Sequence, residues 1–327
     1  MRTLLGALLV AGMLPAQDQS VKLGTLAPEG SPWHGIIRDM ADDWKKASGG
    51  KVAFRIFPGG VLGDEPDMVR KMRIGQLHAA ALTGVGLSEI APEIMGVQLP
   101  MLVRTYDELD YVMERITPRF EAALKAKGFV VLNWGDAGWV HFFTQQPVST
   151  IEQLRTQKLF VWSTSTADAA VWKDAGVQPV ALASTEILTG LKSGLINAFS
   201  TTPLAALSFQ WFGVAKNMTE LPWAPLIGAT VITAKKWESL PEAQRPALVE
   251  AARKSGARLK TETRKLGEEA VKVMKDNGLV VHPVAAGALA EWERQARAAW
   301  PKVMGSTIPA DLLAEIEKHL AEFRARK

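Results

Sequence analysis

The stretch Phe57-Pro58-Gly59-Gly60-Val61-Leu62-Gly63-Asp64-Glu65 decides how the rest of this sequence is interpreted. A β-prone run from Val52 to Phe57 ends at Pro58 and two glycines. The pattern then predicts a helix from near Asp64 to Gly75, followed by a short apolar strand. A strand–loop–helix–strand unit of this kind places its glycine-lined turn at the carboxyl end of a strand, where open α/β sheets bind ligands. We therefore expect an α/β protein with a ligand site beside this loop.

The alternation of strands and helices continues along the chain. Lys158 to Trp162 and Gln178 to Leu182 are predicted strands separated by a helix, an order that favours largely parallel sheets. From near Pro246 to Asn277 the sequence predicts one long, charged helix with an apolar stripe. Because the sequence contains no internal repeat, low-complexity tract or linker, we expect the domains to interleave rather than to follow one another.

Composition excludes several classes of function. The 327 residues are enough for two domains, and the net charge of +4 is spread without the basic cluster that indicates nucleic-acid binding. The chain has no cysteine, which excludes disulfides, thiolate catalysis and cysteine-ligated metals. Scattered histidines, with no His-Glu-x-x-His, Gly-x-Ser-x-Gly or Walker motif, disfavour an enzyme. We expect no catalytic residue, no metal and no cofactor.

The amino terminus has the pattern of a secretory signal. Arg2 supplies a positive charge, Leu4 to Leu14 form an apolar core, and Leu14-Pro15-Ala16 is a cleavage site. We interpret residues 1–16 as a signal peptide and expect a soluble mature protein in the periplasm.

The opening stretch also resembles the most recognisable motif of the DctP-type solute-binding proteins of tripartite ATP-independent periplasmic (TRAP) transporters. Further segments resemble that family in the same order and spacing: Leu23 to Pro28, Ser31 to Trp33, Thr185 to Asn197, and Trp237 to Pro241. The resemblance implies a two-lobed fold of the periplasmic-binding-protein kind, with a long helix crossing both lobes. It implies a small-molecule ligand that closes the lobes and is delivered to the small and large TRAP membrane subunits.

The resemblance also predicts discontinuous lobes. Lobe I is expected to hold residues 17–143 and 227–265, and lobe II residues 144–226 and 266–327. We expect a monomer.

One departure from the family pattern bears on the ligand. Family members typically carry an arginine where this chain has Phe160, and that arginine grips a ligand carboxylate bidentately. The run Asn197 to Pro203 also differs from the family's usual sequence. We therefore expect a less charged, more apolar ligand rather than a C4-dicarboxylate. A monocarboxylate held at the helix start Ser163 to Thr166 stays an alternative.

The expected ligand-binding residues are mostly aromatic, with a few polar side chains at strand and helix ends: Phe160, Trp162, Ser163, Trp139, Phe142, Glu65, Trp33, Val85, Ser200, Thr201 and Trp134. For the aromatic residues other than Phe160, burial in the core is the more ordinary role. Glu65 can hydrogen-bond a ligand hydroxyl or simply favour the helix dipole. A second interpretation of the whole chain is a periplasmic carrier or receptor for a hydrophobic ligand, working with a repeat-containing periplasmic protein.

Overall fold

The computed structural model describes residues 19–163, 166–303 and 307–326. The expected signal peptide, residues 1–16, lies outside the described residues. Within the described residues, no helix is both long enough and apolar enough to cross a membrane.

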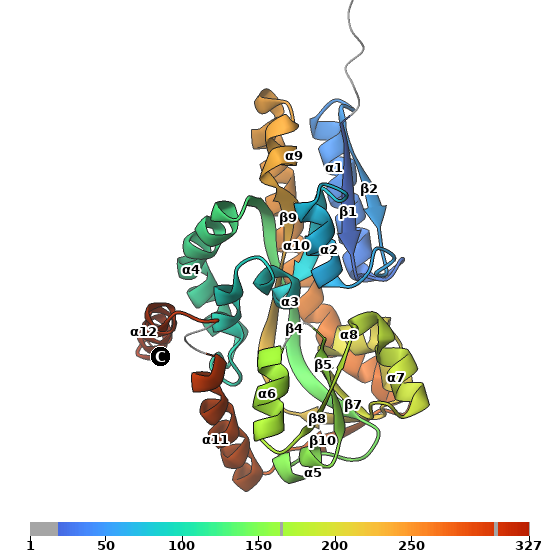
Figure 1. The fold of residues 1–327 in the computed structure, drawn as a ribbon, viewed down its shortest axis with the longest axis vertical. Coiled ribbons are helices and arrows are strands. Elements are labelled where there is room, and N and C mark those ends of the chain that lie inside the picture. The colour runs from blue at the N-terminus through green and yellow to red at the C-terminus, as the bar shows by residue number, and fades with distance from the viewer. Residues whose placement is uncertain (1–18, 164–165, 304–306, 327) are drawn as a thin grey trace, which may run out of the picture.

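Lobe I begins with strands and helices in strict alternation (Figure 1). Its elements are β1 (Gln19–Thr25), α1 (Pro32–Ala47), β2 (Val52–Phe57), α2 (Glu65–Arg73), β3 (Ala79–Thr83), α3 (Gly84–Ser88), η1 (Pro92–Gln98) and α4 (Tyr106–Ala126). Strand β1 lies between β2 and β3 and runs parallel to both. Helix α1 starts at Pro32, because Ser31 accepts a hydrogen bond from the His34 N–H and Pro32 takes the first helical position.

Two long strands connect the lobes. β4 (Phe129–Thr144) is one continuous strand of 16 residues, although the sequence pattern predicts two separate strands, Phe129 to Trp134 and Trp139 to Phe143. It pairs antiparallel with β9 (Ala224–Thr233), and the register shifts between Val131 and Asn133 and again between Asp136 and Gly138. In Figure 1 both strands run from the upper to the lower part of the molecule.

Lobe II repeats the parallel alternation. Its elements are α5 (Ile151–Arg155), β5 (Lys158–Trp162), α6 (Thr166–Asp174), β6 (Gln178–Leu182), η2 (Ser184–Glu186), α7 (Ile187–Ser193), β7 (Ala198–Thr201), α8 (Pro203–Ser208), η3 (Trp211–Gly213) and β8 (Asn217–Glu220). The order across the continuous sheet is β2-β1-β3-β9-β4-β7-β5-β6, so β9 and β4 lie between the parallel strands of lobe I and those of lobe II.

The carboxyl-terminal part is helical apart from one strand. It comprises α9 (Ala234–Ser239), η4 (Glu242–Gln244), α10 (Arg245–Asp276), β10 (Val280–Pro283), α11 (Ala286–Val303) and α12 (Ala310–Arg324). Helix α10 packs on α1 of lobe I and on α8 of lobe II, which confirms the long helix predicted to cross both lobes. Helix α10 also packs on β4, and Gly256 allows that close approach, since a Cβ there would lie only 2.6 Å from the Trp134 carbonyl oxygen.

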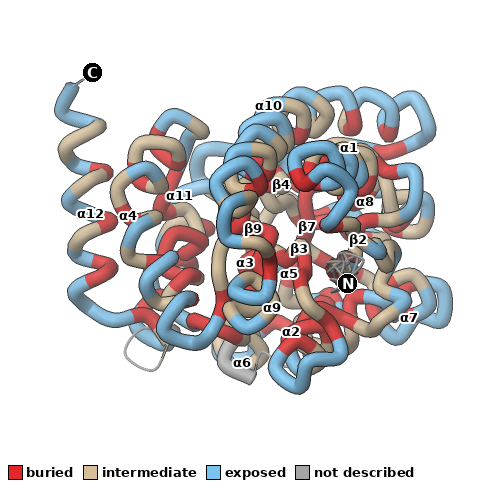
Figure 2. Tube along the Cα trace, turned by 90° about the horizontal axis from the view of Figure 1, so that it is seen from above, coloured by how far each residue is buried: buried red, intermediate tan, exposed pale blue. Residues whose placement is uncertain are grey.

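Four apolar clusters form the core, two in each lobe. Figure 2 shows buried residues along the central strands and exposed ones on the outer turns of α10, α7 and α12. Helix α12 was expected in lobe II, within residues 266–327. It packs instead on α4, and its Leu312, Ile316 and Leu320 join the main core of lobe I. An amphipathic helix at the end of a chain carries an apolar stripe, but the stripe does not say which lobe it will cover.

Candidate functional site

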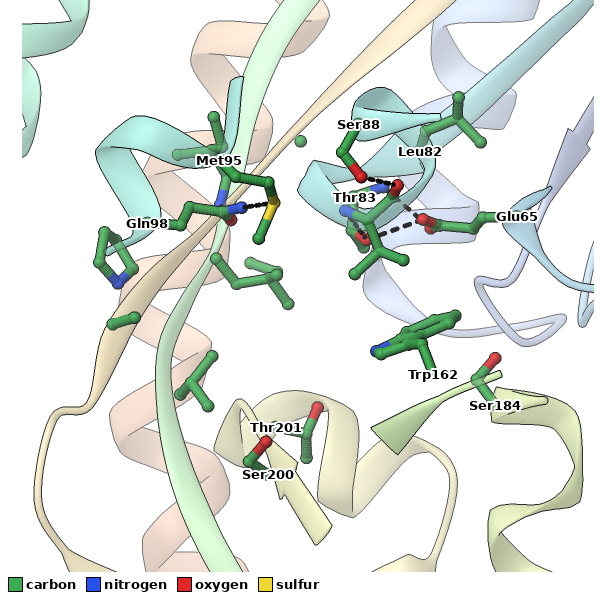
Figure 3. Close-up of a pocket in the computed structure, with 18 of the residues that line it drawn as sticks. Glu65, Leu82, Thr83, Ser88, Met95, Gln98, Trp162, Ser184, Ser200 and Thr201 are labelled. Atoms are coloured by element: carbon green, nitrogen blue, oxygen red, sulfur yellow. Dashed lines mark hydrogen bonds between the residues drawn. The ribbon is translucent and has the colours of Figure 1, made fainter. Parts of the chain in front are cut away.

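A cavity of about 540 Å³ lies between the lobes. Its walls come from β1, β3, α2 and α3 of lobe I, from β5, β7 and η2 of lobe II, and from the connecting strand β9. Figure 3 shows Thr83 and Ser88 on one side of this space and Ser200 and Thr201 on the other. The volume is within the range of roughly 300–1,000 Å³ found for small-molecule sites.

The wall from lobe I is organised by Glu65. Its Oε1 accepts a hydrogen bond from the Thr83 N–H at 2.8 Å, and its Oε2 accepts from the Thr83 hydroxyl at 2.7 Å and from the Gly86 N–H at 2.8 Å. The glycine is needed at position 86, because a Cβ there would lie 2.8 Å from Oε2. Burial raises the pKa of Glu65 to about 7, although these three donors oppose the shift. Glu65 thus ties the first turn of α2 to the junction of β3 and α3.

The wall from lobe II is aromatic. Phe160 and Trp162 stand two residues apart on β5 and therefore on one face, with ring centroids 5.8 Å apart in an edge-on arrangement. Figure 3 shows the Trp162 indole nitrogen directed toward the cavity. Ser200 and Thr201, at the end of β7, also line it. Within the described part of the chain, their hydroxyls have no hydrogen-bond partner, so they are available to a ligand.

The two lobes are joined directly at the glycine-rich loop. Asp64 accepts hydrogen bonds from the Ser184 N–H at 2.7 Å and from the Ser184 hydroxyl at 2.8 Å, and it also caps α2. Both side chains are buried, and burial raises the pKa of Asp64 while the bonds from Ser184 oppose that shift. Gly60, with φ +71°, lies so close that a Cβ would meet the Thr185 methyl at 2.9 Å. These contacts hold the lobes in a closed arrangement.

The charged side chains that line the cavity are all acidic: Glu65, Glu89, Asp136 and Asp168. Among the described lining residues there is no lysine, arginine or histidine. The Oδ2 of Asp136 accepts two N–H bonds from Arg264, at 3.1 and 2.8 Å, and Arg264 also binds Asp110. The Arg264 guanidinium is therefore already paired with two carboxylates of the protein, and it does not line the cavity. A ligand carboxylate that enters this cavity would lose its hydration and find no cationic partner there. Such desolvation of a charge is costly in free energy.

Seven of the residues expected from the sequence line the cavity: Glu65, Val85, Trp33, Phe160, Trp162, Ser200 and Thr201. Phe160 does so while it also packs in a core cluster of lobe II. The structure brings these seven together from five different elements, α1, α2, α3, β5 and β7, which is the arrangement that a binding cleft requires.

The other four expected residues lie outside the lining. Phe142 is fully buried and stacks on Trp292 with centroids 5.3 Å apart. Trp134 packs near Phe120 and donates its indole N–H to Glu121, and Trp139 packs on Tyr106. Ser163 is exposed. The register shifts in β4 explain part of this difference, because each shift changes the face to which the following residues point.

Several lining residues were not singled out from the sequence. Three of them lie at or just after the end of a strand: Thr83 ends β3, Ser88 ends the short helix α3 that follows, and Ser184 begins η2 after β6. A position near the carboxyl end of a strand was the sequence signal that could have identified them as site residues. Gln98 is different: its Oε1 accepts the Ile227 N–H at 2.9 Å across 129 residues, a contact with no local sequence pattern. No group of three acidic or histidine side chains suited to a metal ion occurs among the described residues.

Comparison with known proteins agrees with this architecture. The family model for bacterial extracellular solute-binding protein, family 7 (DctP) matches residues 23–307. The chain is 23% identical over 265 residues to the 2,3-diketo-L-gulonate-binding periplasmic protein YiaO of Escherichia coli, covering 78% of this chain and 80% of that one. It is 22% identical over 269 residues to the sialic acid-binding periplasmic protein SiaP of Vibrio cholerae, covering 80% and 82%.

Solved structures show the same fold. A TRAP periplasmic solute-binding protein from Sulfurospirillum deleyianum with bound succinate aligns with a TM-score of 0.85 at 20% identity, covering 92% of this chain and 99% of that one. The sugar acid binding protein DctPAm from Advenella mimigardefordensis, in complex with galactonate, aligns with a TM-score of 0.87 at 17% identity, covering 94% and 99%. Because the family model covers most of the chain, this protein belongs to family 7 of the bacterial extracellular solute-binding proteins, the DctP-type binding components of TRAP transporters, which are transport proteins and not enzymes.

Proposed function

We propose that this protein captures a small, partly apolar solute without a net negative charge and delivers it to its TRAP membrane subunits. The observation that carries the proposal is the lining of the cavity, which combines Phe160 and Trp162 with acidic side chains and no described cation. The relatives named above bind a sugar acid or another carboxylate, and a carboxylate is best recognised by a bidentate arginine. Phe160 cannot supply that contact.

The polar groups open to a ligand are neutral. The hydroxyls of Ser200 and Thr201 both donate and accept, and the Trp162 indole N–H donates. Such a set suits a hydroxyl, carbonyl or amide group beside an apolar body. The alternative of a monocarboxylate at Ser163 to Thr166 is less favoured, because Asp168 in the first turn of α6 lines the same cavity and would repel an anion.

The first experiment is to denature protein purified from its native host and to identify the released solute by mass spectrometry. We expect a neutral or cationic compound with an apolar part. Calorimetry with succinate should show no binding, and micromolar or tighter succinate affinity would refute the proposal.

A matched pair of variants tests the aromatic wall. Phe160→Ala should weaken the identified solute by about 1–3 kcal/mol, the range for a buried aromatic contact. Phe212→Ala removes a ring that packs against the same core cluster but does not line the cavity. It should leave affinity within about twofold of native. Equal losses in both variants would mean that Phe160 acts through stability alone.

Export and assembly complete the proposal. We infer that residues 1–16 direct the chain to the periplasm and that the mature protein is a monomer. Cell fractionation and light scattering on the purified protein test the two statements separately.

A further inference from the structure

The cavity does not end in the cleft. Beyond the central space it continues between α6 and α11, where its lining residues are Val171, Trp172, Ala175, Trp223, Ala299 and Trp300, here called the side chamber. We propose that the side chamber binds an alkyl or aryl group of the same solute whose polar part lies at Ser200 and Thr201. The inference rests on the proposed function and narrows the ligand to a neutral or cationic amphipathic molecule.

The walls of the side chamber are held in place by contacts that do not involve a ligand. Lys302 of α11 and Asp174 of α6 form an ion pair at 2.6 Å, which ties the two helices together. Trp300 donates its indole N–H to the Pro100 carbonyl at 3.1 Å. The Trp172 and Trp223 rings lie 5.7 Å apart, inclined by 30°. The chamber is therefore a formed space that belongs to the fold.

The chemistry of the chamber selects an apolar occupant. The one polar atom on Trp300 is already paired with Pro100, so its remaining surface is hydrocarbon. Two polar side chains of the same helices, Asp168 and Gln295, also line the cavity, but neither is a cation. Water in an apolar space lacks the two to four polar partners that hold it. An alkyl or aryl group gains by displacing such water, and it gains more as more of its surface is buried.

Continuity with the central space decides what kind of molecule fits. The side chamber and the cleft form one cavity of about 540 Å³, so a single ligand can occupy both. Its polar end meets hydroxyls in the cleft and its apolar end lies against Trp172 and Trp300. Chain length is then a direct measure of occupancy: affinity should rise with each methylene until the chamber is full.

The test uses neutral 1-alkanols of increasing length, which displace the neutral fluorescent probe 1-N-phenylnaphthylamine from the mature protein. For the native protein we expect affinity to tighten about fourfold per added methylene, from the transfer free energy of a buried methylene. Ala175→Trp on α6 and Ala299→Trp on α11 each fill the chamber from a different wall. In both variants the increase should stop at a shorter chain, while the shortest alkanols keep their native affinity.

Two exposed positions on the same helices provide controls. Ala170→Trp on α6 and Ala298→Trp on α11 add the same side chain on the solvent side and should leave the length limit unchanged. If affinity stops rising at the same alkanol length in the native protein and all four variants, the inference that the side chamber binds the alkyl group is wrong. If both filling variants fail to fold, the native series still decides, because affinity that does not depend on chain length contradicts the inference. Failure of the proposed function looks different: the native protein would then bind none of the alkanols, the shortest included.

Discussion

The two walls of the cavity are built on opposite principles. The lobe I wall is polar but internally satisfied, since the Glu65 carboxyl holds two backbone N–H groups and one hydroxyl. The lobe II wall is aromatic, and its hydroxyls at Ser200 and Thr201 have no partner among the described residues. Substitution in the first wall should therefore damage the fold, whereas substitution in the second should damage recognition. A polar side chain that lines a ligand site can therefore serve the fold alone, without contacting the ligand.

The largest expected effect is that of Glu65→Ala. It leaves the Thr83 and Gly86 N–H groups buried without an acceptor. Each such group costs roughly 1–3 kcal/mol, so the free energy of unfolding should fall by about 3 kcal/mol or more in urea titrations. Asp67→Ala on the same helix removes a largely exposed carboxylate that pairs with Arg70 and should cost less than about 1 kcal/mol. Equal losses of unfolding free energy in the two variants would contradict the conclusion that Glu65 stabilises the lobe I wall.

A second effect of similar origin is a pH dependence of stability. Burial raises the pKa of Glu65 from 4.5 to about 7 in the folded protein. A raised pKa means that the folded state holds the proton more tightly, so this contribution is full below about pH 4.5 and is lost as pH rises through about 7. The size is on the order of 3 kcal/mol, from 1.36 kcal/mol per pKa unit.

Urea unfolding of the native protein and of Glu65→Gln at about pH 5 and about pH 8 measures this slope. The glutamine does not titrate, so the variant should lose most of the pH dependence that the native protein shows. The same slope in both proteins would show that Glu65 does not titrate in this range.

A smaller effect is expected at the contact between the walls. Ser184→Ala removes one of the two hydrogen bonds to Asp64, and a bond to a charged acceptor contributes about 1.5–3 kcal/mol. The closed arrangement of the two lobes should become less populated. The affinity for the fluorescent probe 1-N-phenylnaphthylamine should therefore fall by about tenfold or more. Because the native chain has no cysteine, spin labels can be placed at Val61 and Leu195, which are 70% and 51% exposed.

The distance distribution between the two labels reports closure directly. Ser193→Ala, which removes an exposed hydroxyl bonded within α7, is the matched control and should leave the distribution unchanged. A native-like distribution in Ser184→Ala would mean that the Asp64–Ser184 contact follows closure without favouring it.

The smallest effect is expected from Ser200→Ala and Thr201→Val. Each should weaken binding of the identified solute by about 0.5–1.5 kcal/mol, the net contribution of one hydrogen bond. Neither should lower the free energy of unfolding by more than about 0.5 kcal/mol, because neither hydroxyl has a hydrogen-bond partner among the described residues to lose. Calorimetry and urea titration on the same samples separate the two quantities. A loss of unfolding free energy larger than the loss of binding free energy would contradict the conclusion that the lobe II hydroxyls serve ligand recognition.

How far the sequence could predict this site differs between residues. The glycine-rich loop, α2 and α10 follow from local signals: proline, glycine, a capping Asp64 and a helical stripe. Trp162 could be placed at the cleft because it ends a parallel strand, and Phe160 because it takes the position of the arginine in the family pattern that the sequence resembles. Trp139 and Phe142 could not, because they follow the second register shift in β4, between Asp136 and Gly138. A one-residue shift turns a side chain to the other face, and composition does not encode it.

The long-range contacts had no sequence signal either. Gln98 binds the Ile227 N–H across 129 residues, and Asp64 binds Ser184 across 120. Amide, carboxylate and hydroxyl groups suit many local roles, so residue type alone does not reveal a distant partner. Packing of α12 on lobe I is a similar case, since its apolar stripe fits either lobe.

Strands β4 and β9 have a consequence for how this protein unfolds. β4 pairs with β9 from Phe129 to Val140, across the junction of the lobes, and with β7 and β8 in lobe II, so neither lobe contains a complete sheet of its own. A lobe that unfolded alone would leave the other with an unpaired central strand, whose bare N–H and C=O groups are unfavourable. The lobes therefore form one cooperative unit, and heat should melt them in a single calorimetric transition whose van't Hoff and calorimetric enthalpies agree. Neither lobe should persist as a folded fragment after the chain is cut within β4.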